Sequence, residues 1–236
     1  MNTPKSLFES AKTLEKKIGW NFSNQAYLLT AFVHRSYVNE DQTVKEHNER
    51  MEFLGDSVLG LIVSEYLYLN LPDIPEGELS FLRSRLVEAS SCVKFLEKFD
   101  IEKHLLLGKG EIMNLGRGRE SIRADLFEAI LGAIYLDGGY LAAKDFFLSN
   151  FREDINKIIQ TPIRNWKAVL QDWCQKKYQT TPVYKVVSEE GPDHRKVFKI
   201  SVMINGEEKG FGQGNSKKEA QQAAAEQAFS NLPEDL

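Results

Sequence analysis

One stretch, residues 47–60 (HNERMEFLGDSVLG), constrains the fold most, because it places acids along the edge of an apolar helical pattern. Glu49, Glu52 and Asp56 are three and four positions apart, and residues at that spacing share one face of an α-helix. Gly55 lies beside Asp56, although a glycine inside a helix costs about 1 kcal/mol relative to alanine. A glycine there lets another backbone approach closely, so the stretch predicts a helix crossing next to carboxylates.

A simpler interpretation of the same residues concerns only the helix start. Asn48 is a favourable N-cap residue, and Glu49 in the first turn suits the positive end of the helix dipole. Acids near a helix start often have no further role. The carboxylates of this helix therefore gain significance only if a second acidic helix exists.

A second acidic helix is predicted over residues 119–137 (RESIRADLFEAILGAIYLD). Asp125 and Glu128 are three positions apart on one face, and Gly132 lies one turn after Glu128. This helix therefore repeats the combination of acids with an interior glycine.

A crossing of the two helices would bring four carboxylates together: Glu52, Asp56, Asp125 and Glu128. Each pair of unit charges 4 Å apart costs on the order of 1 kcal/mol in water and about 4 kcal/mol at an effective dielectric of 20. Bound cations would offset this repulsion, and a site made of oxygens suits Mg²⁺ or Mn²⁺ better than zinc. Two such ions about 4 Å apart can support phosphodiester hydrolysis.

Length and composition indicate a protein of two domains. The chain has 236 residues, with 42% apolar and 27% charged residues. No signal-peptide core or apolar run of membrane-spanning length is recognised, so we expect a cytoplasmic protein without a membrane partner. Cys92 and Cys174 show no paired spacing, which argues against a zinc site and predicts two ordinary buried thiols.

The charge is unevenly distributed along the chain. The net charge is −4, yet residues 163–236 hold 11 Lys and Arg against 10 Asp and Glu. The preceding residues hold 19 basic and 24 acidic residues. An acidic first part and a slightly basic tail indicate that the two parts of the chain have different functions.

The first 158 residues follow helical patterns throughout. The glycine-rich residues 108–122 predict a loop, and a P-loop is not predicted because the pattern GxxxxGK[ST] is absent. We expect no small-molecule cofactor. Gly138 and Gly139 end the second acidic helix. The helices are predicted at 5–17, 25–36 with His34, Arg35 and Ser36 at its end, 47–70, 76–99, 119–137 and 141–158.

The tail follows a different pattern, helix then three strands then helix. We expect a helix at 164–178, strands at 183–189 and 195–204, a hairpin turn at Asn205-Gly206, and a third strand to Gly212. Ser216 and Glu219 form a capping-box pattern that opens an alanine-rich last helix. The predicted fold is thus an all-α domain over 1–158, a linker at 159–163, and an α-β-β-β-α domain over 164–232.

Lys217 and Lys218 occupy the first turn of that last helix, where the dipole disfavours cations by roughly 0.3–1 kcal/mol each. Free backbone N–H groups beside two lysines form a favourable site for phosphate. The alternative is that both lysines are simply solvated.

Together these motifs resemble one family. Residues 49–60 (ERMEFLGDSVLG) closely resemble the signature of bacterial ribonuclease III, and residues 124–137 (ADLFEAILGAIYLD) resemble its second acidic motif. Residues 166–230 resemble a double-stranded-RNA-binding domain. The resemblance covers nearly the whole chain in the usual order of the family.

The resemblance implies a Mg²⁺-dependent endonuclease that tolerates Mn²⁺ and works as a homodimer on double-stranded RNA. It implies 5′-phosphate and 3′-hydroxyl ends with two-nucleotide 3′ overhangs, and the processing of ribosomal RNA precursors and other structured transcripts. By the resemblance, Glu52, Asp56, Asp125 and Glu128 hold the metal, and Asp56 and Glu128 are the essential catalytic pair. Glu49 and Glu76 match acids near the RNA or dimer surface. The residues that match RNA contacts are Gln171, Gln175, His194, Lys217 and Lys218.

The sequence departs from the family pattern at three positions. Met51 replaces leucine, which is a tolerated exchange. Val33 stands where threonine is common, and Arg123 stands where an apolar residue is usual. Two residues correspond to about 200° around a helix, so Arg123 should point away from the metal side of Asp125.

Rival functions remain open at this point. A non-cleaving RNA-binding regulator could use the same fold, although the presence of all four acids favours an enzyme. A prenyl-synthase-like enzyme would need DDxxD motifs, and a di-iron bundle would need Glu-x-x-His pairs, and neither pattern occurs.

Overall fold

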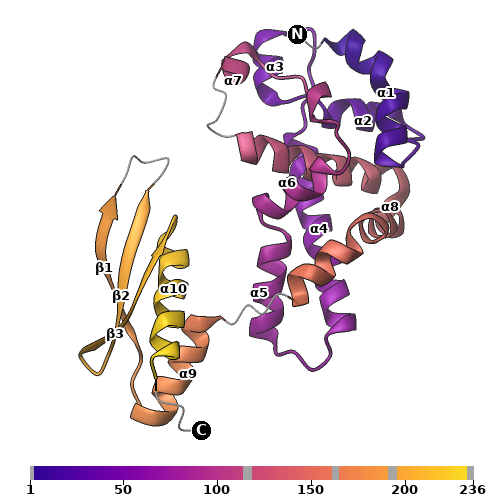
Figure 1. Cartoon of the computed structure of the whole chain (residues 1–236). Helices are drawn as coiled ribbons and strands as arrows, with labels where there is room; N and C mark the ends of the chain where they lie inside the picture. Colours follow the sequence, from indigo (N-terminus) through magenta and orange to yellow (C-terminus); the bar gives the residue numbers. More distant parts are fainter. Residues whose placement is uncertain (1–2, 114–118, 161–164, 191–195, 233–236) are drawn as a thin grey trace. The chain divides into compact units, whose positions relative to one another are not determined.

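The chain forms two compact units, Met1–Thr161 and Pro162–Leu236. The computed structural model describes residues 3–113, 119–160, 165–190 and 196–232. The first unit is all helical, and the second is a three-stranded sheet with two helices (Figure 1). The expected fold class, an all-α domain followed by an α-β-β-β-α domain, is confirmed.

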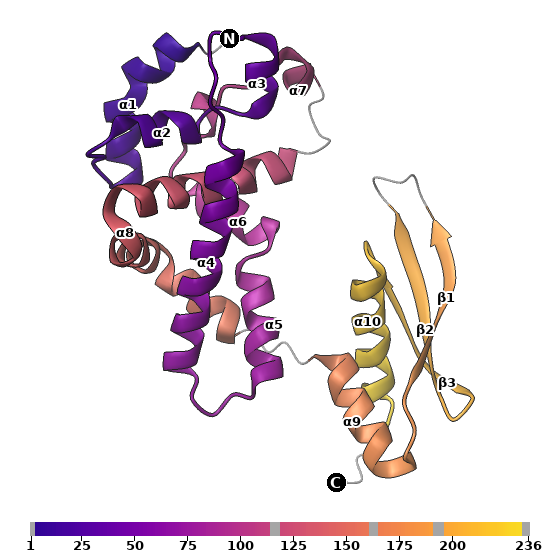
Figure 2. The same cartoon turned by 180° about the vertical axis from the view of Figure 1, so that it is seen from behind.

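The first unit is built around α8, against which α4, α6, α2 and α5 pack (Figure 2). The described part of this unit contains α1 to α8 and the short 3-10 helix η1. Their bounds are α1 Pro4–Ile18, α2 Gln25–Ala31, α3 Arg35–Glu40, α4 Glu49–Asn70, α5 Glu76–Leu86, α6 Ala89–Glu97, η1 Glu102–His104, α7 Lys109–Met113 and α8 Arg119–Gln160.

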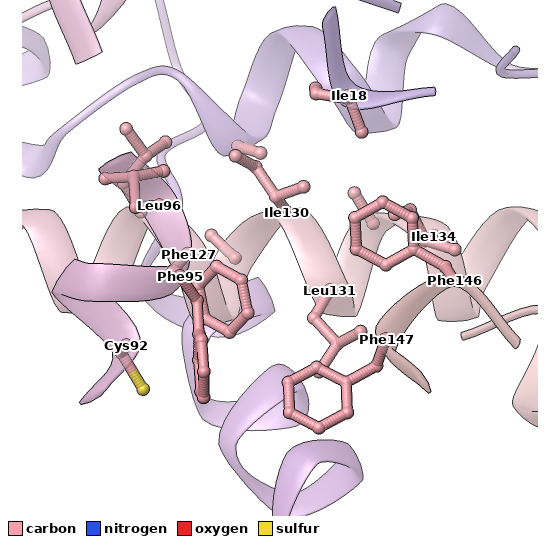
Figure 3. Close-up of a cluster of buried hydrophobic side chains, with 14 of the residues drawn as sticks. Ile18, Cys92, Phe95, Leu96, Phe127, Ile130, Leu131, Ile134, Phe146 and Phe147 are labelled. Atoms are coloured by element: carbon pink, nitrogen blue, oxygen red, sulfur yellow. The ribbon is translucent and has the colours of Figure 1, made fainter. Parts of the chain in front are cut away.

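Aromatic rings fill the core between α6 and the two halves of α8 (Figure 3). The Phe95 ring of α6 lies 5.5 Å from the rings of Phe127 and Phe147 and 4.7 Å from that of Phe151, measured between centroids. Such tilted and edge-on pairs add to the free energy gained by burying the rings. The core thus fixes α6 against the segment of α8 that carries the acids.

The break expected at Gly138-Gly139 is present as a kink within α8. Gly139 has φ 79° and ψ −176°, which is not helical, and two helical segments meet there. A positive φ favours glycine, since it has no Cβ. The second segment corresponds to the helix predicted over 141–158.

α8 also has the length and composition of a membrane span. An 18-residue window of this helix has a mean hydropathy of 1.3. Half of that window is buried inside the protein, and core helices give the same signal. The apolar residues of α8 serve here as the centre of a helical unit.

The single helix expected over 76–99 is wrong, because the chain forms α5 and α6 instead. Glu88 has an extended backbone (φ −69°, ψ 154°) between the two helices. The Ser91 hydroxyl donates to the carbonyl of Arg85 at 2.7 Å, and the Ser90 hydroxyl donates to Glu88. Serine side chains that bond locally to the chain compete with the helix in this way.

The helix expected over 25–36 is also too long. α2 ends at Ala31, and His34 is the N-cap of α3, with its Nδ1 accepting from the Ser36 amide at 3.2 Å. The chain leaves the helix because Val33 bridges Leu106, so that the His34 amide donates to the Leu106 carbonyl at 3.0 Å. Part of the loop expected at 108–122 is the short α7, and residues 114–118 lie outside the described residues.

The second unit comprises α9 (Trp166–Tyr178), β1 (Val183–Glu190), β2 (Val197–Ile204), β3 (Glu207–Gly214) and α10 (Lys217–Ser230). The sheet has the order β1-β2-β3 and is antiparallel throughout. Asn205 (φ 52°) and Gly206 (φ 81°) make the hairpin turn predicted for this pair.

β3 and α10 pack with their backbones in close approach. A Cβ built on Gly212 would lie 2.1 Å from the Ala224 amide nitrogen, and one on Gly210 would lie 2.6 Å from the Ala224 carbonyl oxygen. Four alanines of α10 are buried in the core of this unit: Ala220, Ala224, Ala225 and Ala228. The capping box is only half formed, since Ser216 accepts from the Glu219 amide but Glu219 accepts from the Asn215 amide.

Candidate active site

The site is created by a contact between the backbones of α4 and α8. A Cβ built on Gly55 would lie 1.8 Å from the Glu128 carbonyl oxygen, and one on Gly132 would lie 2.4 Å from the Met51 carbonyl oxygen. No side chain could occupy either space without moving the opposite backbone. The two interior glycines therefore allow the crossing that the sequence predicted.

This crossing brings together three carboxylates, which we call the carboxylate site: Glu52, Asp125 and Glu128. One ligand oxygen from each lies within 4.8 Å of the others, and all three side chains are half-buried. Asp56 lies one turn further along α4 and is exposed. Its charge acts on Glu52 and Glu128, although its oxygens are not part of the closely spaced group.

The electrostatics of the carboxylate site disfavour its full ionisation. Burial, with the charges of Asp56, Asp125 and Glu52, raises the pKa of Glu128 to about 7. Burial raises the pKa of Asp125 as well, with Glu49 adding to the effect. Burial and the neighbouring acids also raise the pKa of Glu52. A cation among these oxygens would relieve both the desolvation and the repulsion.

The composition of the site fits a hard divalent cation. It offers carboxylate oxygens only, and Mg²⁺ binds through one or two carboxylates while keeping several waters. The half-buried position leaves room for such waters and for a substrate.

Cys92 is a neighbour of the site that sequence reasoning missed. Its Sγ lies 3.7 Å from Glu128 Oε1 and 3.8 Å from the Val87 carbonyl oxygen, and the side chain is fully buried (Figure 3). Burial and the Glu128 carboxylate raise the pKa of this thiol, so it stays protonated and can donate. No spacing could have indicated this contact, because 36 residues separate the pair and α6 brings them together. Both cysteines are buried and free, as predicted.

Glu49 lies at the rim of the site rather than among the three oxygens. Its carboxylate is 3.4 Å from Arg35 Nη1 and 3.8 Å from His47 Nδ1.

The predicted capping role of Asn48 is wrong, since its side chain makes no cap bond and is 1% exposed. Its helical backbone (φ −75°, ψ −18°) differs from the extended conformation of a capping residue, and its backbone N–H donates to the Val33 carbonyl oxygen.

Two further sequence-predicted residues lie away from the carboxylate site. Glu76 is exposed in the first turn of α5 and accepts from the Ser80 hydroxyl. Arg123 pairs with Glu97 at 2.8 Å and Glu102 at 2.6 Å, so it points away from the carboxylate site as expected. It joins the start of α8 to the segment that contains α6 and η1.

The second unit presents the residues predicted to contact RNA in two places. Gln171 and Gln175 are exposed one turn apart on α9, and Lys217 and Lys218 are exposed in the first turn of α10. His194 lies outside the described residues.

Comparison with known proteins identifies both units. The family model described as Ribonuclease-III-like matches residues 24–155, and that of the double-stranded RNA binding motif matches residues 166–232. "Ribonuclease 3" of Protochlamydia amoebophila (strain UWE25) is 61% identical over 232 residues, which is 98% of this chain and 96% of the relative. The chain belongs to the ribonuclease III family.

Other relatives agree with this assignment. "Ribonuclease 3" of Leptospira interrogans is 44% identical over 94% of this chain and 91% of the relative. A solved nuclease domain of ribonuclease III from Campylobacter jejuni is 35% identical, with a TM-score of 0.55, and covers 60% of this chain and 96% of that domain. The chain is therefore an endoribonuclease of this family, a metal-dependent one, that acts on double-stranded RNA.

Proposed function

We propose that the carboxylate site hydrolyses phosphodiester bonds in double-stranded RNA with Mg²⁺ as the metal. The observation that carries this proposal is the convergence of Glu52, Asp125 and Glu128 at a glycine crossing, with Asp56 one turn away. Mg²⁺, when bound, would polarise the phosphate and lower the pKa of a bound water.

The residues of the site have distinct tasks in this proposal. Glu52 and Asp125 supply further oxygens that hold the metal. Asp56 and Glu128 also hold it and form the pair that is essential for catalysis. The oxygen of water bonds to phosphorus and the water gives up a proton, the bond from phosphorus to the 3′ oxygen breaks, and the 3′ oxygen takes up a proton and leaves as a hydroxyl, so that one water molecule is consumed. The products carry 5′-phosphate and 3′-hydroxyl ends, with two-nucleotide 3′ overhangs when each strand of the duplex is cut.

A gel assay on a long RNA duplex tests the metal requirement. We expect cleavage in Mg²⁺ or Mn²⁺, none in EDTA, and recovery when Mg²⁺ is restored in excess, because four acids without cations repel the phosphate backbone. End-labelled products would report the ends and the overhang. Cleavage that persists in EDTA would contradict the proposed metal chemistry.

The second unit is proposed to hold the duplex by its shape. Gln171 and Gln175 reach the minor groove, together with His194, and Lys217 and Lys218 contact phosphates. This mode spans about 16 base pairs of an A-form duplex with little reading of sequence. Ribosomal RNA precursors and other structured transcripts in the cytoplasm are the proposed substrates.

We also propose that the enzyme is a homodimer formed through α4. Four large apolar side chains on this helix are exposed, and three of them form one stripe: Phe53, exposed by 76%, Leu61 by 55% and Tyr68 by 73%. They lie within about 80° of one another around the helix, and such an apolar stripe marks an interaction site. The Campylobacter nuclease domain is described as having flexibility in a region involved in its own dimer formation.

Phe53→Asp should convert the dimer to a monomer at micromolar concentration, because a charge would then lie in an apolar interface. Sedimentation velocity would measure the change. Phe8→Asp is the matched control, since Phe8 of α1 is also exposed, by 63%, and lies outside the stripe. A Phe53→Asp protein that sediments like wild type would exclude α4 as the interface.

A further inference from the structure

Lys217, one of the two lysines at the start of α10, is already paired within the protein. Its Nζ lies 2.8 Å from Glu189 Oε1 at the end of β1, and 5.5 Å from the centroid of the Phe198 ring. Lys218 has no ion pair among the described residues. The two lysines therefore differ, although the sequence presents them as equivalent.

The ion pair of Lys217 suits the free protein. The positive end of a helix dipole disfavours a cation, and the Glu189 carboxylate offsets that effect. The hydrogen bond from Lys217 lowers the pKa of Glu189, so its carboxylate is ionised near neutral pH. A phosphate that approached Lys217 would meet this negative charge at hydrogen-bond distance from the same ammonium.

We propose that Glu189 competes with RNA phosphate for the ammonium of Lys217 and thereby limits the affinity of the second unit for duplex RNA. This inference rests on the proposed phosphate contact of Lys217. The Glu189–Lys217 pair is partly exposed, with side-chain exposures of 36% and 56%, and such pairs are weak. RNA can therefore displace the carboxylate at modest cost, which makes Glu189 a determinant of affinity rather than a block.

The neighbouring residue provides a matched control. Glu190 lies on the same strand and pairs with Lys199 at 2.9 Å, with a side-chain exposure of 61%. Glu190→Gln removes the same charge one residue away and leaves the pair of Lys217 intact. A general repulsion between acid and RNA would affect both variants alike, whereas competition for Lys217 requires Glu189.

The experiment measures binding of the full chain to a 20-base-pair RNA duplex by fluorescence anisotropy in EDTA, where the metal chemistry is absent. Glu189→Gln should bind about two- to five-fold more tightly than wild type, a range that corresponds to a weak surface ion pair. The affinity of Glu190→Gln for the duplex should stay within about 1.5-fold of the wild-type affinity. Equal melting temperatures of the two variants would show that folding does not cause the difference.

Lys217→Ala separates this inference from the contact on which it depends. It should weaken binding, and adding Glu189→Gln to it should give no further gain, because the shared partner is gone. Weaker binding by Lys217→Ala together with no gain from Glu189→Gln alone would overturn the competition and leave the phosphate contact standing. Unchanged binding by Lys217→Ala would overturn both.

Discussion

Replacing Glu128 with glutamine is expected to abolish cleavage of double-stranded RNA and leave duplex affinity within a few-fold of wild type. Glu128 contributes one of the three converging oxygens, and the amide of glutamine removes its charge with little change of shape. Loss of one group that supports charge in the transition state lowers rates by about 10²–10³-fold, and more where it also holds the metal. The proposed RNA contacts lie in the second unit and are untouched.

The same variant should change how stability depends on pH. The pKa of Glu128 is about 7 in the folded protein, above the ordinary value of 4.5 for a glutamate. Because the folded protein binds the proton of Glu128 more tightly than the unfolded chain does, the protonated side chain stabilises the fold fully at pH values below its pKa in the unfolded state. This contribution to stability is lost as the pH rises through the folded-state pKa of about 7. Without metal, Glu128→Gln should therefore melt above wild type at pH 8, and the difference should shrink at pH 5.

These outcomes are measured by single-turnover cleavage, duplex affinity and melting curves. Glu120→Gln is the control, because Glu120 is an exposed glutamate in the first turn of the same helix. It should match wild type in all three measurements. A Glu128→Gln enzyme that cuts at nearly the wild-type rate in saturating Mg²⁺ would remove this carboxylate from the mechanism.

Spacing along the chain carried most of the information about the fold and the site. The acids of α4 and α8 could be assigned to helix faces because residues three and four apart must share a face. The interior glycines Gly55 and Gly132 indicated in addition that the two helices cross in close contact. Asn205-Gly206 specified its hairpin for an equally local reason, since both residues adopt positive φ.

The features that the sequence did not reveal depend on partners far away in the chain. Cys92 meets Glu128 only because α6 packs on α8, and Lys217 meets Glu189 only because the fold brings the start of α10 close to the end of β1. His34 lies outside the predicted helix because its backbone N–H donates to the Leu106 carbonyl oxygen. Periodicity describes one element at a time, so such pairings between elements lie beyond it.

The second large effect is expected for Gly55→Ala, which should destabilise the first unit and abolish cleavage. The added Cβ would lie 1.8 Å from the Glu128 carbonyl oxygen, a distance that no real Cβ contact shows. The opposing atom is backbone in a buried helix, so α4 and α8 must separate. Forced expansion of a packed interior costs about 1–3 kcal/mol or more, and separation also moves Glu52 away from Asp125 and Glu128.

Gly60→Ala on the same helix is the control for this effect. Nothing lies within 4 Å of a Cβ at Gly60, and alanine is favoured over glycine inside a helix by about 1 kcal/mol. The same substitution should therefore stabilise the protein at position 60 and destabilise it at position 55. For a unit of this size, 3 kcal/mol corresponds to a fall in melting temperature of about 6–12 °C.

Gly132→Ala tests whether the crossing behaves as one contact. Its Cβ would lie 2.4 Å from the Met51 carbonyl oxygen, so it opens the same pair of helices from the other side. Once Gly55→Ala has separated the helices, Gly132→Ala has less left to disrupt, and the loss of stability in the double variant should be smaller than the sum of the two single losses. Denaturant unfolding of the four proteins measures this coupling. If Gly55→Ala instead unfolds and cuts like Gly60→Ala, the helices can separate freely, and the close crossing is not what holds the carboxylates together.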